Sequence, residues 1–156
     1  MRILLDTNVL LRLADASAAE HTVIRSAMIA LAGQSLESVA TAQVLVEFWA
    51  VATRPQSANG LGWDEATTTR ALNALTARFP LLVEGPGIYG RWLALVQTGV
   101  RGKRAHDARI AAVMLENSVT HILTLNEGDF AGFPAIAPVR PEAVVAGALD
   151  SLRGSS

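Results

Sequence analysis

The chain has 156 residues, of which 51% are hydrophobic and 17% charged, and its formal net charge is −1. This composition predicts a compact globular protein, and it excludes a disordered chain and a surface that is basic all over. Cysteine is absent, which excludes disulfides and thiolate chemistry. The three histidines share no ligand spacing, so we expect no zinc site.

Strands and helices are predicted to alternate along the chain. In order, they are a strand at 2–5, helices at 9–14 and 20–33, a strand at 38–41, a helix at 42–53, a polar loop at 55–62, a helix from Trp63 to Phe79 with Asp64 as its N-cap, a strand at 81–83, a helix at 86–99, a basic loop, a helix at 105–116, a strand at 121–125, a turn or short helix at 126–130, a strand at 136–139, a helix that starts at Pro141, and a disordered tail at 151–156.

This alternation predicts βαβ units, and hence a parallel sheet with helices on both faces. We expect an α/β protein, a three-layer α/β/α sandwich with a short-stranded, mainly parallel sheet. No repeat and no linker divides the chain, so residues 1–150 are expected to form one domain. In such sheets, ligands bind beyond the carboxyl ends of the strands.

No segment predicts contact with a membrane. The longest stretch without a charged residue runs over 11 residues, from Ser26 to Leu36, whereas a helix that crosses a bilayer needs about 20. Asp6 interrupts the apolar run at the N-terminus, so a signal peptide is not expected. We therefore expect a cytoplasmic protein without a membrane partner.

Four acidic residues lie at the ends of apolar segments or in line with a buried stripe: Asp6, Glu47, Asp107 and Asp129. A carboxylate in such a place must be paired or must bind a cation. Three of the four map to the carboxyl edge of the predicted sheet, and Asp107 joins them if its helix starts there. Four carboxylates together predict a divalent metal and chemistry on an anionic substrate.

Each acid also has a structural interpretation that stays open. Asp107 lies on the buried side of its helix, but first-turn acids are also favoured by the helix dipole. Glu47 could mark the boundary of an amphipathic helix, and Asp6 could close a turn. Asp129 lies in a sequence typical of turns, and Glu127 competes with it for the same role.

A basic strip precedes and enters the helix at 105–116. It contains four of the 13 basic residues: Arg101, Lys103, Arg104 and Arg109. Such a strip can bind phosphate even when the net charge of the protein is near zero. A solvated loop is the alternative, because four charges are few for nucleic-acid recognition.

The motifs together resemble a known family. They are residues 3–11 (ILLDTNVLL), the helical Glu47, residues 106–112 (HDARIAA) and residues 123–130 (LTLNEGDF). The chain resembles the PIN-domain ribonucleases over residues 1 to about 145, and in particular the VapC-type toxins of bacterial and archaeal toxin–antitoxin pairs. The first and third motifs are the specific ones.

The resemblance implies that the four acids surround Mg²⁺ or Mn²⁺, with Asp6 and Asp107 as direct ligands. Thr7, Asn8 and Asn126 would be the polar groups around them, and Arg101, Lys103 and Arg104 would contact the substrate. The implied activity is a metal-dependent endoribonuclease that hydrolyses RNA phosphodiesters with metal-activated water. A homodimer is implied, with a cognate antitoxin whose tail lies near the helices at 42–53 and 63–79.

Other functions fit the sequence less well. A PIN-fold protein that binds RNA or a partner without a toxin role, or a nuclease of RNA processing, stays possible. A phosphatase with Asp6 as its nucleophile would require a second acid where Asn8 stands. A nucleotide-binding module would require a glycine-rich loop after the first strand, and His21 lies outside every motif, which disfavours a catalytic histidine pair.

Overall fold

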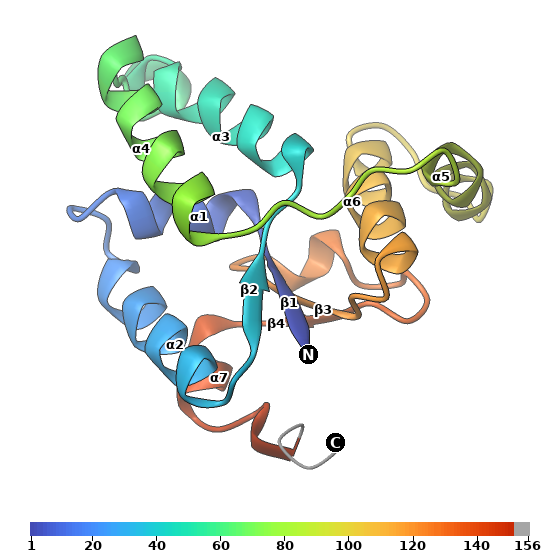
Figure 1. Cartoon of the computed structure of the whole chain (residues 1–156). Coiled ribbons are helices and arrows are strands. Elements are labelled where there is room, and N and C mark those ends of the chain that lie inside the picture. The colour runs from blue at the N-terminus through green and yellow to red at the C-terminus, as the bar shows by residue number, and fades with distance from the viewer. Residues whose placement is uncertain (152–156) are drawn as a thin grey trace.

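A computed structural model describes residues 1–151 (Figure 1). Its elements in chain order are β1 (Arg2–Leu5), α1 (Thr7–Ala14), α2 (His21–Gly33), β2 (Glu37–Val39), α3 (Ala42–Thr53), the 3₁₀ helix η1 (Gln56–Ala58), α4 (Glu65–Arg78), α5 (Ile88–Val96), α6 (Arg104–Glu116), β3 (His121–Leu123), the 3₁₀ helix η2 (Glu127–Asp129), β4 (Ala137–Val139) and α7 (Pro141–Val145). The predicted disordered tail at 151–156 lies outside the described residues, apart from Ser151.

A four-stranded parallel sheet forms the centre, in the order β2-β1-β3-β4. In β1, Ile3 is paired with Ser38 of β2 and with His121 of β3. Strands of a parallel sheet are buried on both faces and are therefore continuously apolar. Accordingly, the side chains of Ile3, Leu4 and Leu5 are 0% exposed.

Helices cover both faces of this sheet. The connection from β1 to β2 contains α1 and α2, and the connection from β2 to β3 returns to the other side of β1. Because parallel crossovers are right-handed, the two connections cross opposite faces of the sheet, and α3 of the second connection also packs against α1 of the first. Figure 1 shows α2 packed with α7 on one side, and α5 packed with α6 on the other. The predicted three-layer α/β/α fold is confirmed. That residues 1–150 form one domain stays a prediction.

The predicted strand at 81–83 is wrong. The segment makes a single bridge, between Ala40 and Leu81, with Leu82 N–H donating to the carbonyl of Ala40 at 2.9 Å. Val83 already points to solvent and is 75% exposed. The segment touches the edge of the sheet for one residue pair and then crosses toward α5, so apolar residues alone did not make it a strand.

Several predicted boundaries also shift. The helix expected at 86–99 is α5, nine residues long, because Pro86 and Gly87 form a turn before it and residues 97–99 form a turn after it. The strand expected at 121–125 ends at Leu123, where the chain turns. The N-cap role predicted for Asp64 is confirmed, since its side chain accepts from Thr67 N–H at 2.7 Å.

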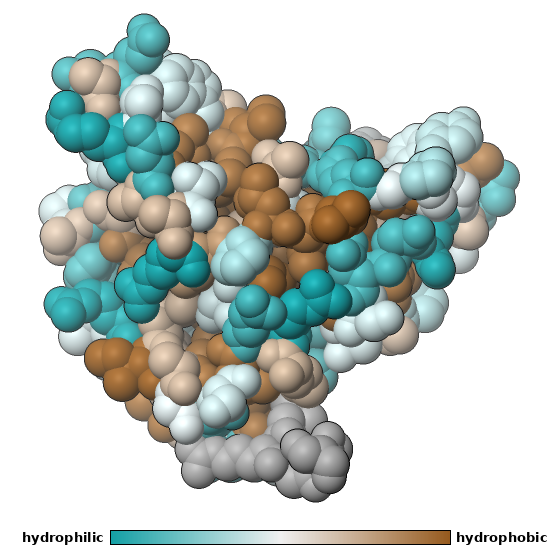
Figure 2. Space-filling view, in the orientation of Figure 1, coloured by the Kyte–Doolittle hydropathy of each residue, from teal (hydrophilic) through white to brown (hydrophobic). Residues whose placement is uncertain are grey.

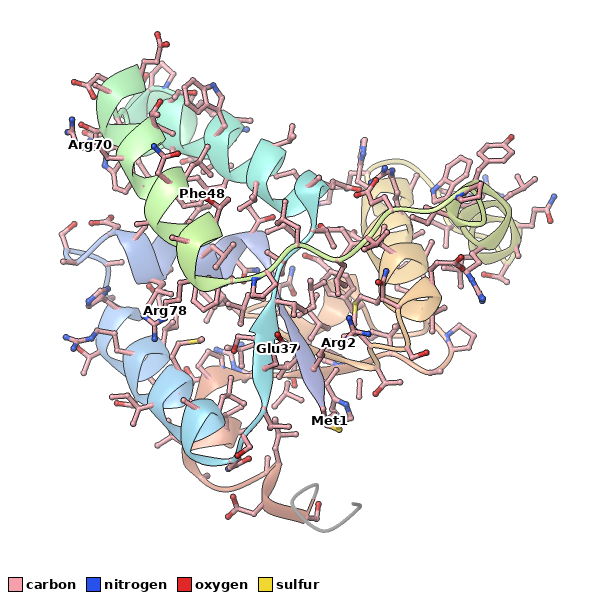
Figure 3. The ribbon with its side chains drawn as sticks, in the orientation of Figure 1. Met1, Arg2, Glu37, Phe48, Arg70 and Arg78 are labelled. Atoms are coloured by element: carbon pink, nitrogen blue, oxygen red, sulfur yellow. The ribbon has the colours of Figure 1, made fainter. Side chains whose placement is uncertain are left out.

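Figure 3 shows Met1, Arg2 and Glu37 at the amino end of the strands, and Phe48 between α3 and α4. Phe48 is 0% exposed and meets the Trp63 ring edge-on, with the ring centroids 6.3 Å apart.

Within residues 1–151, no helix is long and apolar enough to cross a membrane.

Candidate functional site

Asp6 lies where β1 ends and α1 begins. Its Oδ1 accepts from Thr7 N–H at 2.7 Å, which caps the helix. The side chain is 6% exposed. Burial raises the pKa of the Asp6 carboxyl above its usual value, and the charges of Glu47 and Asp129 raise it further, while hydrogen bonds from Thr124 and Thr7 oppose the rise. An acid in this place carries its charge only with donors around it.

Asn8 and Thr124 supply those donors to the second oxygen of Asp6. Asn8 Nδ2 donates to Oδ2 at 2.9 Å, and the Thr124 hydroxyl donates to it at 2.6 Å. Asn8 Oδ1 accepts in turn from Leu125 N–H, at 3.1 Å, and Thr124 Oγ1 accepts from Asn126 N–H, at 3.0 Å. The ends of β1 and β3 are thereby fixed to each other. Asn126 enters this network through its backbone, and its side chain is exposed.

Glu47 reaches the same place from α3. The hydroxyl of Thr7 donates to its Oε2 at 3.0 Å, and Gln43 Nε2 donates to its Oε1 at 2.8 Å. The helix starts directly after the edge strand β2, and the side chain of Thr41 accepts from Val44 N–H as its N-cap. The first turns of α3 therefore lie at the carboxyl edge of the sheet.

Asp107 occupies the first turn of α6 and is half-buried. Burial is the main cause that raises the pKa of Asp107 to about 6, and the charges of Asp129, Asp6 and Glu47 add to the rise, against the opposing charge of Arg104. Three carboxylates from three other elements therefore lie near enough to act on Asp107. Among residues 1–151 no hydrogen bond to its carboxylate is found.

Asp129, the last residue of η2, completes the group. Its charge raises the pKa values of both Asp6 and Asp107, whereas Glu127 is exposed and contributes to neither. Of the two acids that compete for this place in the sequence, Asp129 is the one that lies near Asp6 and Asp107.

The donor set fits a hard divalent cation. It consists of carboxylates with hydroxyl and amide groups around them, and carboxylate oxygens are the ligands that Mg²⁺ and Mn²⁺ prefer. Within the described part of the chain, no three acids are close enough to form a ready set of direct ligands.

The basic strip is divided in the structure. Arg109 forms an ion pair with Glu84, at 2.7 Å. Arg104 donates to the carbonyl of Ala131 at 2.9 Å and lies over the ring of Phe133. Arg101 and Lys103 are exposed on the loop before α6. Two of the four basic residues are therefore engaged within the protein.

Two polar residues of this site were not predicted, Gln43 and Thr124. Gln43 precedes Glu47 by one helical turn, a spacing at which side chains meet, so the sequence carried a signal for it. Thr124 follows the last residue of β3, at the same edge as Asp6. Its alignment with Asp6 depends on the register of β1 and β3, which the sequence does not give.

Two cavities lie near the acid cluster, and neither is lined by Asp6, Glu47, Asp107 or Asp129. The larger, of about 520 Å³, is lined by Glu84, Gly85, Pro86, Ile88, Tyr89, Trp92 and Arg109. The smaller, of about 360 Å³, is lined by Ala42, Gln43, Val46, Glu84, His106 and Arg109. Since Glu84 and Arg109 line both, the two cavities adjoin, and Gln43 connects the smaller one to Glu47.

Apolar surface is exposed next to these cavities. Figure 2 shows hydrophobic residues gathered at the centre of this face, over the segment that joins α4 to α5. Val83 is 75% exposed, Val46 68% and Leu81 46%. The three tryptophans, Trp49, Trp63 and Trp92, are half-buried within the chain.

Comparison with known proteins agrees with this fold. No curated protein matches the chain by sequence. Among solved structures, VapBC2 from Rickettsia felis bound to a DNA fragment from their promoter matches with a TM-score of 0.66 and 15% identity, over 90% of this chain and 98% of that chain. VapBC-1 from nontypeable Haemophilus influenzae matches with a TM-score of 0.66 and 18% identity, over 91% and 99%.

A third similar structure is VapC20 from Mycobacterium tuberculosis, a sarcin–ricin loop cleaving toxin, with a TM-score of 0.62 and 20% identity. That match covers 87% of this chain and 99% of the other. At these identities the likeness concerns the fold. The sequence itself matches the PIN domain over residues 3–135. This match spans all four acids and most of the chain, and we conclude that the protein belongs to the PIN domain family.

Proposed function

We propose that this protein is a divalent-metal-dependent endoribonuclease and the toxin of a toxin–antitoxin pair. PIN-domain proteins are nucleases as a family. The observation that carries the proposal is that Asp6, Glu47 and Asp129 all lie near enough to Asp107 for their charges to add to the effect of burial, which is the main cause that raises the pKa of Asp107. A protein that only binds RNA has no use for four mutually repelling carboxylates.

In this proposal Asp6 and Asp107 hold the metal ion. Mg²⁺ or Mn²⁺ at this place would neutralise charge on the phosphate and lower the pKa of a water molecule. Glu47 and Asp129 orient the attacking water, and Thr7 holds Glu47 through the hydrogen bond of 3.0 Å. Each of these roles requires an oxygen that accepts a hydrogen bond or binds a cation, which carboxylates provide.

The neighbouring residues position and bind. Asn8 and Thr124 fix the orientation of the Asp6 carboxylate by two hydrogen bonds. Arg101 and Lys103, exposed on the loop before α6, are free to contact RNA phosphates. Arg104 is held by the Ala131 carbonyl, so its guanidinium contributes mainly charge to that face. Phosphate contacts position a nucleic acid without reading its sequence.

Two protein partners belong to the proposal. The similar structures from R. felis and H. influenzae are VapBC structures, which supports a cognate antitoxin here. A cavity of about 450 Å³ lies along α4, with Arg25 and Arg78 in its lining, and would accept an acidic tail.

For the homodimer, the exposed apolar surface around Val83 and Val46 is a suitable interface.

The decisive experiment is cleavage of structured RNA by the purified protein. Cleavage should require Mg²⁺ or Mn²⁺ and stop with excess chelator. Products should end in 5′-phosphate and 3′-hydroxyl, because the attacking group is water rather than the neighbouring 2′-hydroxyl. Asp107→Asn should abolish the activity in a folded protein. Cleavage that persists in chelator, or products that end in 2′,3′-cyclic phosphate, would contradict the mechanism.

A further inference from the structure

We propose that Gln43 is a positioning residue for the acid cluster, and that Arg109 sets the orientation of its amide. The inference rests on the proposed function, because it assigns Gln43 a role through Glu47. Gln43 lies one turn before Glu47 on α3 and touches neither Asp6 nor Asp107. Its contribution is to hold another side chain, so its removal should affect the reaction more than the fold.

One amide group makes three contacts that connect α3 with α6. Gln43 Nε2 donates to Glu47 Oε1 at 2.8 Å and to the backbone carbonyl of His106 at 3.0 Å. Its Oε1 accepts from Arg109 Nη1 at 3.1 Å. The carbonyl belongs to the residue before Asp107. Gln43 therefore ties Glu47 to the turn of α6 that carries Asp107.

Chemistry permits only one orientation of this amide. A guanidinium is a donor only, while a carboxylate and a carbonyl are acceptors only. The amide oxygen must therefore face Arg109, and the nitrogen must face Glu47 and His106. Rotating the amide by half a turn would set oxygen against two acceptors and nitrogen against a donor. Arg109 is itself fixed, because Nη2 donates to Glu84 Oε2 at 2.7 Å.

Both oxygens of Glu47 are consequently held. Gln43 binds Oε1, and Thr7 binds Oε2 at 3.0 Å. A carboxylate with both oxygens engaged cannot rotate freely, and its free lone pairs keep fixed directions. Partners that orient the groups around a metal are typically worth about 10–100-fold in metal affinity or activity. We expect an effect of that size from Gln43.

Gln43→Met tests this, since methionine has similar length and volume but donates no hydrogen bond. The matched control is Gln34→Met. Gln34 lies just before β2, at the opposite end of the sheet from the acids, and its side chain donates to Asp150. Three quantities are measured for each: Mn²⁺ affinity by calorimetry without RNA, kcat and KM for RNA cleavage, and unfolding in urea. For Gln43→Met we expect Mn²⁺ affinity or kcat to fall about 10-fold or more, with KM within about twofold.

The control should keep wild-type Mn²⁺ affinity and kcat, because Gln34 lies at the opposite end of the sheet. The inference is overturned if Gln43→Met has the Mn²⁺ affinity and the kcat of the wild type. It is also overturned if Gln34→Met lowers these two quantities as much as Gln43→Met does. A wild-type protein that neither binds Mn²⁺ nor cleaves RNA would overturn the proposed function and this inference with it. Wild-type activity with an unaffected Gln43→Met overturns the inference alone.

Arg109 is tested by a double-mutant cycle. Arg109→Met leaves the amide free to turn, so we expect a smaller loss than for Gln43→Met. The double variant should be no worse than Gln43→Met alone, because both changes remove the same restraint. Glu84→Gln, which removes the charge of Glu84 but keeps an oxygen that can accept from Arg109 Nη2, should stay near wild type. Additive losses in the double variant would show that Arg109 acts independently of Gln43.

Discussion

The hydroxyl of Thr124 donates a hydrogen bond of 2.6 Å to Oδ2 of Asp6, across 118 positions of the chain. Thr124 is 0% exposed and Asp6 is 6% exposed, so water does not substitute for this contact. The bond opposes the burial that raises the pKa of the Asp6 carboxyl. It thus helps Asp6 to stay ionised at the junction of β1 and β3.

Thr124→Val should therefore destabilise the protein. Valine has the same shape but leaves Asp6 with one donor fewer and Asn126 N–H without its acceptor. Leaving buried polar groups unpaired costs about 1–3 kcal/mol. Urea unfolding at pH 7 measures the change, with Thr69→Val at an exposed position of α4 as the control. Equal stability of the two variants would contradict the role of this hydrogen bond.

Asp107 predicts a pH dependence of stability in the metal-free protein. The fold raises the pKa of Asp107 from 3.8 to about 6, so the folded state binds a proton more tightly than the unfolded chain does. The contribution of this group to the free energy of unfolding then decreases as the pH rises from 3.8 to about 6, and the loss is complete above that window.

Asp107→Asn should remove this contribution and make the metal-free protein more stable at pH 7. The measurement is urea unfolding in chelator at pH 4.5 and pH 7, for the wild type and the variant. The difference between the two proteins should be larger at pH 7. A difference that is the same at both pH values would show that the charge of Asp107 does not oppose folding.

Thr41→Ala should weaken the start of α3. The hydroxyl of Thr41 accepts from Val44 N–H at 3.1 Å and is completely buried. Losing such an N-cap costs about 1 kcal/mol, and up to about 2. Thr41→Ser keeps the hydroxyl and should recover most of the stability in thermal or urea unfolding. If serine is as harmful as alanine, the methyl group rather than the cap stabilises this helix.

Val83→Lys should dissociate the proposed homodimer. Val83 is 75% exposed within an apolar surface that includes Val46 and Leu81, and a buried lysine without a partner is costly. Sedimentation should show a dimer for the wild type and a monomer for the variant at the same concentration. Val145→Lys, 51% exposed on α7, should remain dimeric. A wild type that is monomeric at high concentration removes the homodimer from the proposal.

Periodicity predicted the architecture because the strands are apolar and the helices carry clear stripes. Asp6 could be placed at the edge of the sheet because it directly follows the apolar run Ile3–Leu5, which the sequence predicts to be a strand. The segment at 81–83 has the same apolar character and forms no strand. Pairing depends on the neighbour that the fold provides, and here Ala40 offers one residue pair.

The polar network was harder to predict than the acids. Acids in apolar surroundings are conspicuous in a sequence, whereas a glutamine on a helix is ordinary. Arg109 belongs to the basic strip that can bind phosphate, and in the structure it pairs with Glu84 and Gln43. Glu84 lies 25 positions away, and only the packing of the segment after α4 against α6 brings it there.

The acid cluster draws on segments spread from Asp6 to Asp129, and the β1–β3 pairing that unites them forms between residues more than a hundred positions apart. Long-range contacts of this kind form late, after the chain between them is available. During translation, a nascent chain would therefore carry the first three acids out of the ribosome without a site. The four acids can meet only after Asp129 has been synthesised and has left the ribosome.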